Sequence, residues 1–259
     1  MDYEETGITK DELVDSIDIK LAELEERTGF PDRDADYFHR LEIMTFARNA
    51  IYNMPVSDYQ ADLMEQQGGG SVLDDIYNYW HDYIMEWGDT HDEKLTMSFD
   101  LVRQYIDSVE RRDLTHALYD RASADMQKYT AELRGSDMDS VLNQSRYFVG
   151  YNAALSMLEP SKKTGNQGLL LLLTYDRPVK AICDIWQNQR NTEVVSMNDL
   201  SRALGSAVNT RKAKLEQNPE SVRSEQPETQ RYIDLYISRY VDAQAQVRSE
   251  PDRDHEMEP

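Results

Sequence analysis

Basic residues are missing from a long stretch of this chain. Between Arg48 and Lys94 there are ten acidic residues and no lysine or arginine. Residues 1–100 hold 25 acidic and 7 basic residues, a net charge of −18, whereas the other 159 residues hold 24 and 21, a net charge of −3. Ordinary solvated surfaces mix both signs. The stretch therefore predicts a surface that repels nucleic acid and anionic membranes and that suits a basic partner.

Cysteine and long apolar runs are also scarce. The single cysteine, Cys183, excludes an internal disulfide framework, and its apolar neighbours in "VKAICDIW" predict a small core residue rather than a nucleophile. The longest apolar run covers residues 169–173, far short of the roughly 20 residues that a membrane helix needs. The opening "MDYEETGITKDEL" is acidic, unlike a secretory signal. We therefore expect a cytoplasmic protein.

Motifs for nucleotide binding and for nucleophilic catalysis are missing too. No glycine-rich loop follows an apolar strand, and neither GxxxxGK[ST] nor GxSxG occurs, so we expect no cofactor and no enzymatic activity. His39, His81 and Asp82 resemble the metal-binding set of HD-type phosphohydrolases, and Arg111 and His116 have the spacing of HEPN-type ribonucleases. Both motifs are short, and we favour their interpretation as solvated helix-surface residues.

Apolar residues do recur at helical spacing along most of the chain. A capping box formed by Thr9 and Glu12 predicts the first helix, and further helices are expected over residues 34–53, 57–66, 71–87, 91–134 (with a break near 113–115), 136–158, 178–189, 197–205, 207–218 and 228–247. Residues 169–175 fit either a buried strand or the start of a helix, and residues 192–196 fit a short strand. The predicted fold is all-α. It comprises a bundle-like acidic domain over residues 1–158, a linker over 159–168, a smaller, mainly helical domain over 169–246, and a disordered tail over 247–259.

Residues 71–87 read as a helix with two faces. The apolar face carries Leu73, Tyr77, Trp80, Ile84 and Trp87. The other face carries acids, which we expect to form an outward ridge that continues beyond the helix. The predicted partner-binding residues in and around this ridge are Asp58, Asp62, Glu65, Asp74, Asp75, Tyr79, Asp82, Tyr83, Glu86, Asp89, Asp92 and Glu93.

The segment "MNDLSRALGSAVNTRKAKL" in the second half of the chain resembles a helix-turn-helix. Leu200 and Leu204 would pack the first helix, and Gly205 would make the turn. The resemblance implies phosphate contacts from the basic side chains of the segment. These alternative nucleic-acid-binding residues are Arg202, Arg211, Lys212 and Lys214.

Taken together, these patterns favour a non-enzymatic acidic protein that binds a basic, nucleic-acid-binding partner. In its most concrete form this is a DNA-mimic inhibitor of a defence nuclease, encoded by a phage or mobile element, because anti-restriction and anti-CRISPR proteins are similar in composition. Two alternatives stay open. One is a DNA-binding regulator that uses the helix-turn-helix-like segment, and the other is a helical scaffold that bridges other proteins.

Overall fold

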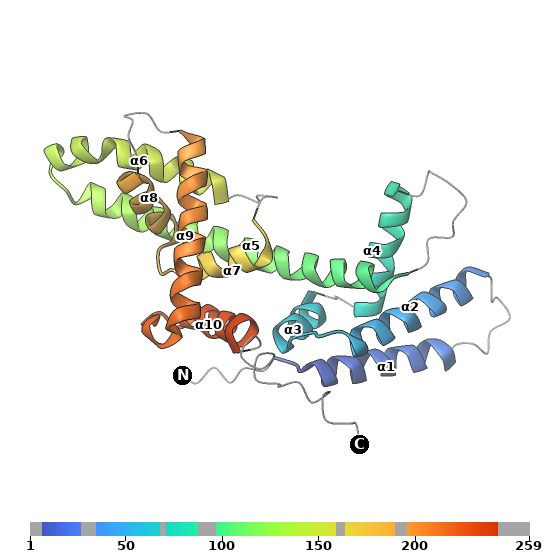
Figure 1. Ribbon diagram of the computed structural model, residues 1–259. Coiled ribbons are helices and arrows are strands. Elements are labelled where there is room, and N and C mark those ends of the chain that lie inside the picture. Colours follow the sequence, from blue (N-terminus) through green and yellow to red (C-terminus); the bar gives the residue numbers. More distant parts are fainter. Residues whose placement is uncertain are drawn as a thin grey trace, which may run out of the picture. The chain divides into compact units, whose positions relative to one another are not determined.

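The computed structural model describes residues 7–26, 35–67, 71–87, 97–158, 164–189 and 196–242 (Figure 1). Within these ranges the chain is helical and contains no strand, so the predicted all-α class is confirmed. The chain divides into two compact units, Met1–Arg112 and Asp113–Pro259, which we call the first and the second unit. None of the described helices is both long enough and apolar enough to cross a membrane.

Among its described residues, the first unit contains four helices and the start of a fifth. They are α1 (Lys10–Glu26), α2 (Ala35–Asn53), α3 (Asp58–Gln67), α4 (Val72–Trp87) and the beginning of α5 (Phe99–Arg134). The predicted capping box is present at α1, where the Thr9 backbone N–H donates to Glu12 Oε2 at 2.7 Å and the Glu12 N–H donates to Thr9 Oγ1 at 3.3 Å. Ser57 and Gln60 form the same reciprocal pair at the start of α3.

The core of the first unit is built from the apolar stripes of these helices. α1 packs against α2 and α3, and α2 packs against α4. The predicted inward residues Leu13, Ile17 and Leu21 of α1 are buried, as are Met44 and Ile51 of α2. On α4, Leu73 and Trp80 enter the core as expected, together with Val72 and Ile76. The helical spacing of apolar residues in the sequence thus predicted most of these buried residues correctly.

α5 is one uninterrupted helix from Phe99 to Arg134, so the predicted break near residues 113–115 is wrong. The helix contains neither glycine nor proline, and Leu114 and Leu118, one turn apart, are fully buried. Their burial continues the apolar face across the expected break. The residues of α5 up to Arg112 belong to the first unit, and those from Asp113 onward belong to the second.

The second unit continues with α6 (Met138–Leu158), α7 (Asn166–Leu173), α8 (Pro178–Gln189), α9 (Met197–Gln217) and α10 (Pro227–Tyr236). A 3₁₀ turn (Pro219–Ser221) precedes α10 and a π-helical turn (Ile237–Asp242) follows it. α7 settles the open question of residues 169–173, because all five leucines are helical and buried. Residues 192–195, which make up all but the last residue of the proposed short strand, and residues 247–259, for which a tail was proposed, lie outside the described residues.

The placement of α6 explains why the observed division differs from the predicted boundary at residues 159–168. α6 packs against α8 and α9, so residues 138–158 join the C-terminal helices rather than the acidic N-terminal ones. Gly150 of α6 allows this helix to approach α8 closely. A Cβ atom at Gly150 would lie 2.6 Å from Cζ3 of the buried Trp186 on α8. The side-chain stripes of α6 and α8 therefore fit together only because position 150 has no side chain.

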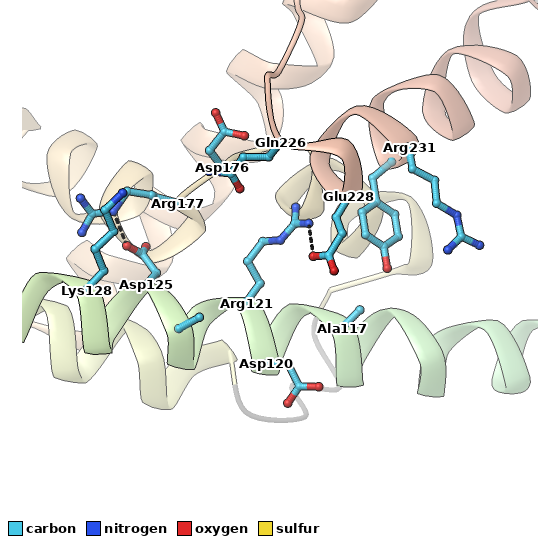
Figure 2. A pocket seen from close by; sticks show the side chains of 12 residues that line it. Ala117, Asp120, Arg121, Asp125, Lys128, Asp176, Arg177, Gln226, Glu228 and Arg231 are labelled. Atoms are coloured by element: carbon cyan, nitrogen blue, oxygen red, sulfur yellow. Dashed lines mark hydrogen bonds and ion pairs between the residues drawn. The ribbon is translucent and has the colours of Figure 1, made fainter. Parts of the chain in front are cut away.

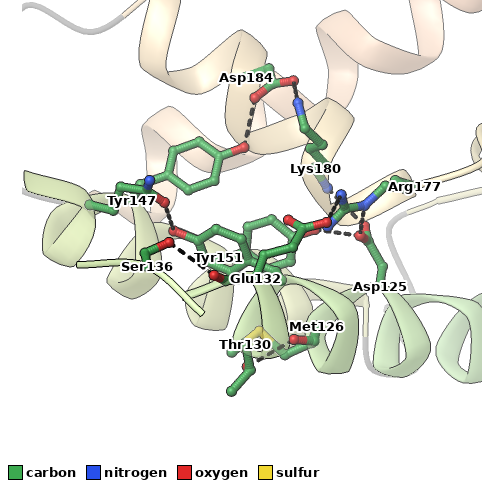
Figure 3. Close-up of polar contacts among 12 residues, drawn as sticks. Asp125, Met126, Thr130, Glu132, Ser136, Tyr147, Tyr151, Arg177, Lys180 and Asp184 are labelled. Carbon is green, nitrogen blue, oxygen red and sulfur yellow. Dashed lines mark hydrogen bonds and ion pairs between the residues drawn. The ribbon is translucent and has the colours of Figure 1, made fainter. Parts of the chain in front are cut away.

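A buried polar network joins α5, α6 and α8 within the second unit (Figure 3). Asp125 is 3% exposed, and its carboxylate accepts hydrogen bonds from Tyr151 Oη at 2.5 Å, from Arg177 Nε at 2.5 Å and from the Lys180 backbone N–H at 3.0 Å. Beside it, Tyr147 Oη donates to Asp184 Oδ1 at 2.6 Å. Each buried carboxylate oxygen of Asp125 thus has a donor, as a buried charge requires.

Candidate functional site

Three of the predicted partner-binding acids lie on α3. Asp58, Asp62 and Glu65 are spaced by four and three residues, which puts them on one face of the helix. Asp58 Oδ1 accepts the Lys10 backbone N–H at 3.1 Å, so this carboxylate also holds the start of α1. Asp62 accepts the Gln66 amide at 2.7 Å, and Glu65 is exposed. This face of α3 is acidic, but the carboxylate of Asp58 also stabilises the start of α1.

The acids of α4 differ in how much of their charge reaches solvent. Asp74 forms an ion pair with Arg40 of α2. Asp75 is half-buried, and burial raises the pKa of its carboxyl, with the neighbouring Asp74 acting in the same direction. Asp82, by contrast, has 87% of its side chain exposed, with the exposed His81 at 3.9 Å. Among these three, Asp82 is the one whose charge is fully presented to a partner.

The two predicted tyrosines also have different surroundings. Tyr79 is half-buried, and its ring packs edge-on against Tyr105 with 5.6 Å between the ring centroids. Burial raises the pKa of Tyr79. Tyr83 is exposed. Tyr79 therefore contributes to packing, whereas Tyr83 is free to offer an aromatic surface to a partner.

Four further acids belong to the predicted ridge. Glu86 belongs to α4, but its side chain lies outside the described residues, as do Asp89, Asp92 and Glu93 in full. Their part in a shared surface therefore stays a prediction.

Several basic side chains of the first unit are engaged by groups of the same unit. Lys10 Nζ donates to the carbonyl oxygens of Tyr52 at 2.8 Å and Met54 at 2.7 Å, at the end of α2. Arg48 makes a bidentate contact with Asp18, with both N···O distances 2.6 Å, and these hydrogen bonds lower the pKa of Asp18. Arg48 thus neutralises one carboxylate, whereas Lys10 stabilises a helix end through backbone carbonyls, and the unit keeps an excess of acids.

That excess is large within the described part of the first unit, where 19 acidic residues face 7 basic ones, a net charge of −12. Many of the acids are exposed and have no ion pair with a described residue. They include Asp11, Glu25, Glu42, Glu65 and Asp100.

The residues that resemble an HD-type metal-binding set form no metal site within the described ranges. His81 and Asp82 are exposed on α4, while His39 of α2 packs edge-on against Trp80 with 5.4 Å between ring centroids. No group of three or more His, Cys, Asp or Glu side chains within the described ranges is arranged to hold a metal ion. Cys183 is fully buried, and burial raises the pKa of its thiol to about 12, which fits the predicted core residue.

The helix-turn-helix interpretation of residues 197–215 is corrected by the structure. α9 is a single 21-residue helix, and Gly205 lies in its middle rather than in a turn. Arg211 points inward. Its guanidinium donates to the backbone carbonyl and to Oγ1 of Thr174, the latter at 2.8 Å, and lies 4.5 Å from the ring centroid of Tyr175. The segment therefore lacks the two-helix geometry by which such proteins enter the major groove.

The other basic residues of this segment are on the surface of α9. Arg202 pairs with Asp199 one turn away, Lys212 lies 3.8 Å from Glu216, and Lys214 is exposed. Two of the three are thus balanced by acids of the same helix, which leaves little charge for a DNA backbone.

Sequence reasoning missed a cluster of charged residues in the second unit. Arg121, Asp125 and Lys128 follow one another at steps of four and three residues on α5, and Arg177 and Arg231 lie near them around one pocket. Their spacing on α5 was a detectable signal, but the partners from residues 176–177 and from α10 are more than 45 residues away in the chain.

No family model, curated protein or solved structure matches the sequence.

Proposed function

We propose that this chain is a non-enzymatic binding protein whose acidic first unit engages a basic, nucleic-acid-binding partner. The observation that supports the proposal best is that cations of this unit make contacts within the unit, while many of its acids are exposed. Lys10 and Arg48 serve internal contacts, while exposed acids such as Glu65 and Asp82 meet solvent. A surface of one sign attracts a partner of the other sign through rapid, salt-sensitive association.

The concrete form of the proposal is a DNA mimic that occupies the nucleic-acid channel of a nuclease, as an inhibitor of the anti-restriction or anti-CRISPR kind. DNA carries one negative charge per about 1.7 Å of helix axis. Acids three or four residues apart on a helix are separated by about 4.5–6 Å along its axis. A single helix is therefore too sparse a mimic, so the proposal requires acids from more than one helix, with Tyr83 adding contact area.

The first experiment is affinity capture with the intact protein and a variant carrying Asp62→Asn, Glu65→Gln and Asp82→Asn. Asp58 is left intact because it holds the start of α1. We expect the wild-type protein to retain a basic nuclease at low salt and to release it both as salt rises and when duplex DNA is added in excess. The triple variant should retain far less of the same nuclease, because three charges of the surface are gone.

The matched control removes three exposed acids from the second unit, with Asp139→Asn, Glu220→Gln and Glu225→Gln. This variant should bind the nuclease like the wild type. Equal retention by all three proteins, or binding that neither salt nor duplex DNA disturbs, would contradict the DNA mimic. Insensitivity to salt in particular would favour a helical scaffold with an apolar interface.

A further inference from the structure

The second unit contains a pocket of about 510 Å³, within the size range of small-molecule sites. One side is formed by α5, and the other sides are formed by Asp176 and Arg177 and by the start of α10 (Figure 2). On α5, Arg121 and Lys128 lie two turns apart on the same face, with the short side chain of Ala124 between them. The short side chain leaves room for a ligand between two cations.

Arg121 is held in place by groups that leave part of its charge uncompensated. Its side chain is only 9% exposed, Nη1 donates to the Leu173 carbonyl oxygen, and the guanidinium lies 5.4 Å from the ring centroid of Tyr232. Among the described residues its one carboxylate partner is Glu228, a single contact of 3.3 Å. A guanidinium buried to this degree is best satisfied by a bidentate oxyanion.

Glu228 is poorly suited to be that permanent partner. Its side chain is 87% exposed, and it lies in the first turn of α10. A surface carboxylate with one long contact contributes little binding energy. A ligand oxyanion that enters the pocket can therefore displace Glu228 from Arg121 at low cost.

The other charged groups of the pocket leave a positive region beside Arg121. The carboxylate of Asp125 is already occupied by three donors, and Asp176 accepts the Ser224 hydroxyl. Asp120 also lines the pocket, but Figure 2 shows its side chain directed away from Arg121. Lys128 has no ion pair with a described residue. Arg177 is ion-paired with Asp125 and Glu132, but its Nη2 is buried without a hydrogen-bond partner in the part of the chain that the structure describes.

We infer that this pocket binds the oxyanion of a small organic ligand, a phosphate monoester or a carboxylate, between Arg121 and Lys128. Glu228 occupies the place of this oxyanion when the ligand is absent. Arg231, which Figure 2 shows at the opposite end of the pocket from Lys128, is placed to contact the remainder of the ligand. The inference concerns the second unit alone and does not rest on the function proposed for the first.

The test is isothermal titration calorimetry of the intact protein with inorganic phosphate and, separately, with succinate, at constant ionic strength. Saturable binding of either probe supports the inference, and the tighter of the two identifies the ligand as phosphate-like or carboxylate-like. Arg121→Gln should weaken binding by about tenfold or more, because a fixed bidentate donor is lost. Lys128→Gln, at an exposed position where folding is not at risk, should weaken it by a few-fold.

Two further variants make the result decisive. Glu228→Gln should tighten binding, since the competing carboxylate is removed, and Lys214→Gln on the surface of α9 should leave binding unchanged. The inference is overturned if neither probe binds, if Lys214→Gln weakens binding as much as Lys128→Gln, or if Glu228→Gln weakens it as Arg121→Gln does.

Discussion

Gly150 shows how a single position decides whether two helices can pack. The six-membered ring of Trp186 occupies the space beside the Cα atom of Gly150, and three ring atoms would lie within 3.1 Å of a Cβ added to Gly150. Both partners are buried, so neither the ring nor the helix backbone has free space into which to move. In a core of this density even one methyl group forces a rearrangement of its neighbours.

We therefore expect Gly150→Ala to lower the free energy of unfolding by about 1–3 kcal/mol, despite the higher helix propensity of alanine. Urea unfolding followed by circular dichroism measures the change. Gly205→Ala is the matched control, because no atom lies within 4 Å of a Cβ built there. Equal effects of the two substitutions would show that Trp186 does not confine position 150.

At the scale of the element, several helix starts and ends could be predicted from local sequence, although the predicted break near residues 113–115 and the predicted turn at Gly205 are wrong, and contacts between distant residues could not be predicted. The capping box at Thr9 and the boundaries of α8 followed from residues within one or two turns. Arg211 looked like a DNA contact, because a basic residue in a polar helix has the same local pattern whether it faces solvent or a carbonyl. Its partner, Thr174, is 37 residues away in the chain, and only the packing of α7 against α9 brings the two together.

For the candidate sites too, local features could be predicted from the sequence, whereas contacts between distant residues could not. The acid excess of the first unit can be counted from the sequence alone, but the pairing of Asp74 with Arg40 and the burial of Tyr79 depend on how α2, α4 and α5 meet. Composition therefore gives the net charge of the first unit, whereas it could not predict which acids remain exposed.

The continuity of α9 gives a prediction of its own at this scale. Because Gly205 lies within the helix, at a backbone conformation open to other residues and with free space for a side chain, Gly205→Ala should raise the free energy of unfolding by about 0.5–1 kcal/mol. Gly205→Pro should lower it by about 3 kcal/mol or more, since proline removes a helical hydrogen bond. Thermal and urea unfolding measure both changes. A turn at this position would reverse the first effect and reduce the second.

For the whole molecule, the main property is an uneven distribution of charge along the chain. Residues 1–112 hold 27 acidic and 10 basic residues, and residues 113–259 hold 22 and 18. The two units therefore differ in chemistry, with a large excess of acidic residues in the first and a pocket lined by both acidic and basic side chains in the second. Self-repulsion within the acidic unit opposes compaction, and its stability depends on the burial of apolar residues such as Met44 and Ile51.

The buried tyrosines determine what happens when the protein is taken to high pH. Burial raises the pKa of Tyr236 to about 12, and it raises the pKa of Tyr147 and Tyr151 further, aided by hydrogen bonds to Asp184 and Asp125. In the unfolded chain these phenols ionise near pH 10, so the stability linked to their protons is complete below that pH and is lost as the pH rises above it. We expect an alkaline transition at which several phenolate absorbances near 295 nm appear in one abrupt step together with loss of helical ellipticity. A smooth titration of all sixteen tyrosines around pH 10 with the helices intact would mean that these hydroxyls are open to hydroxide in the native state.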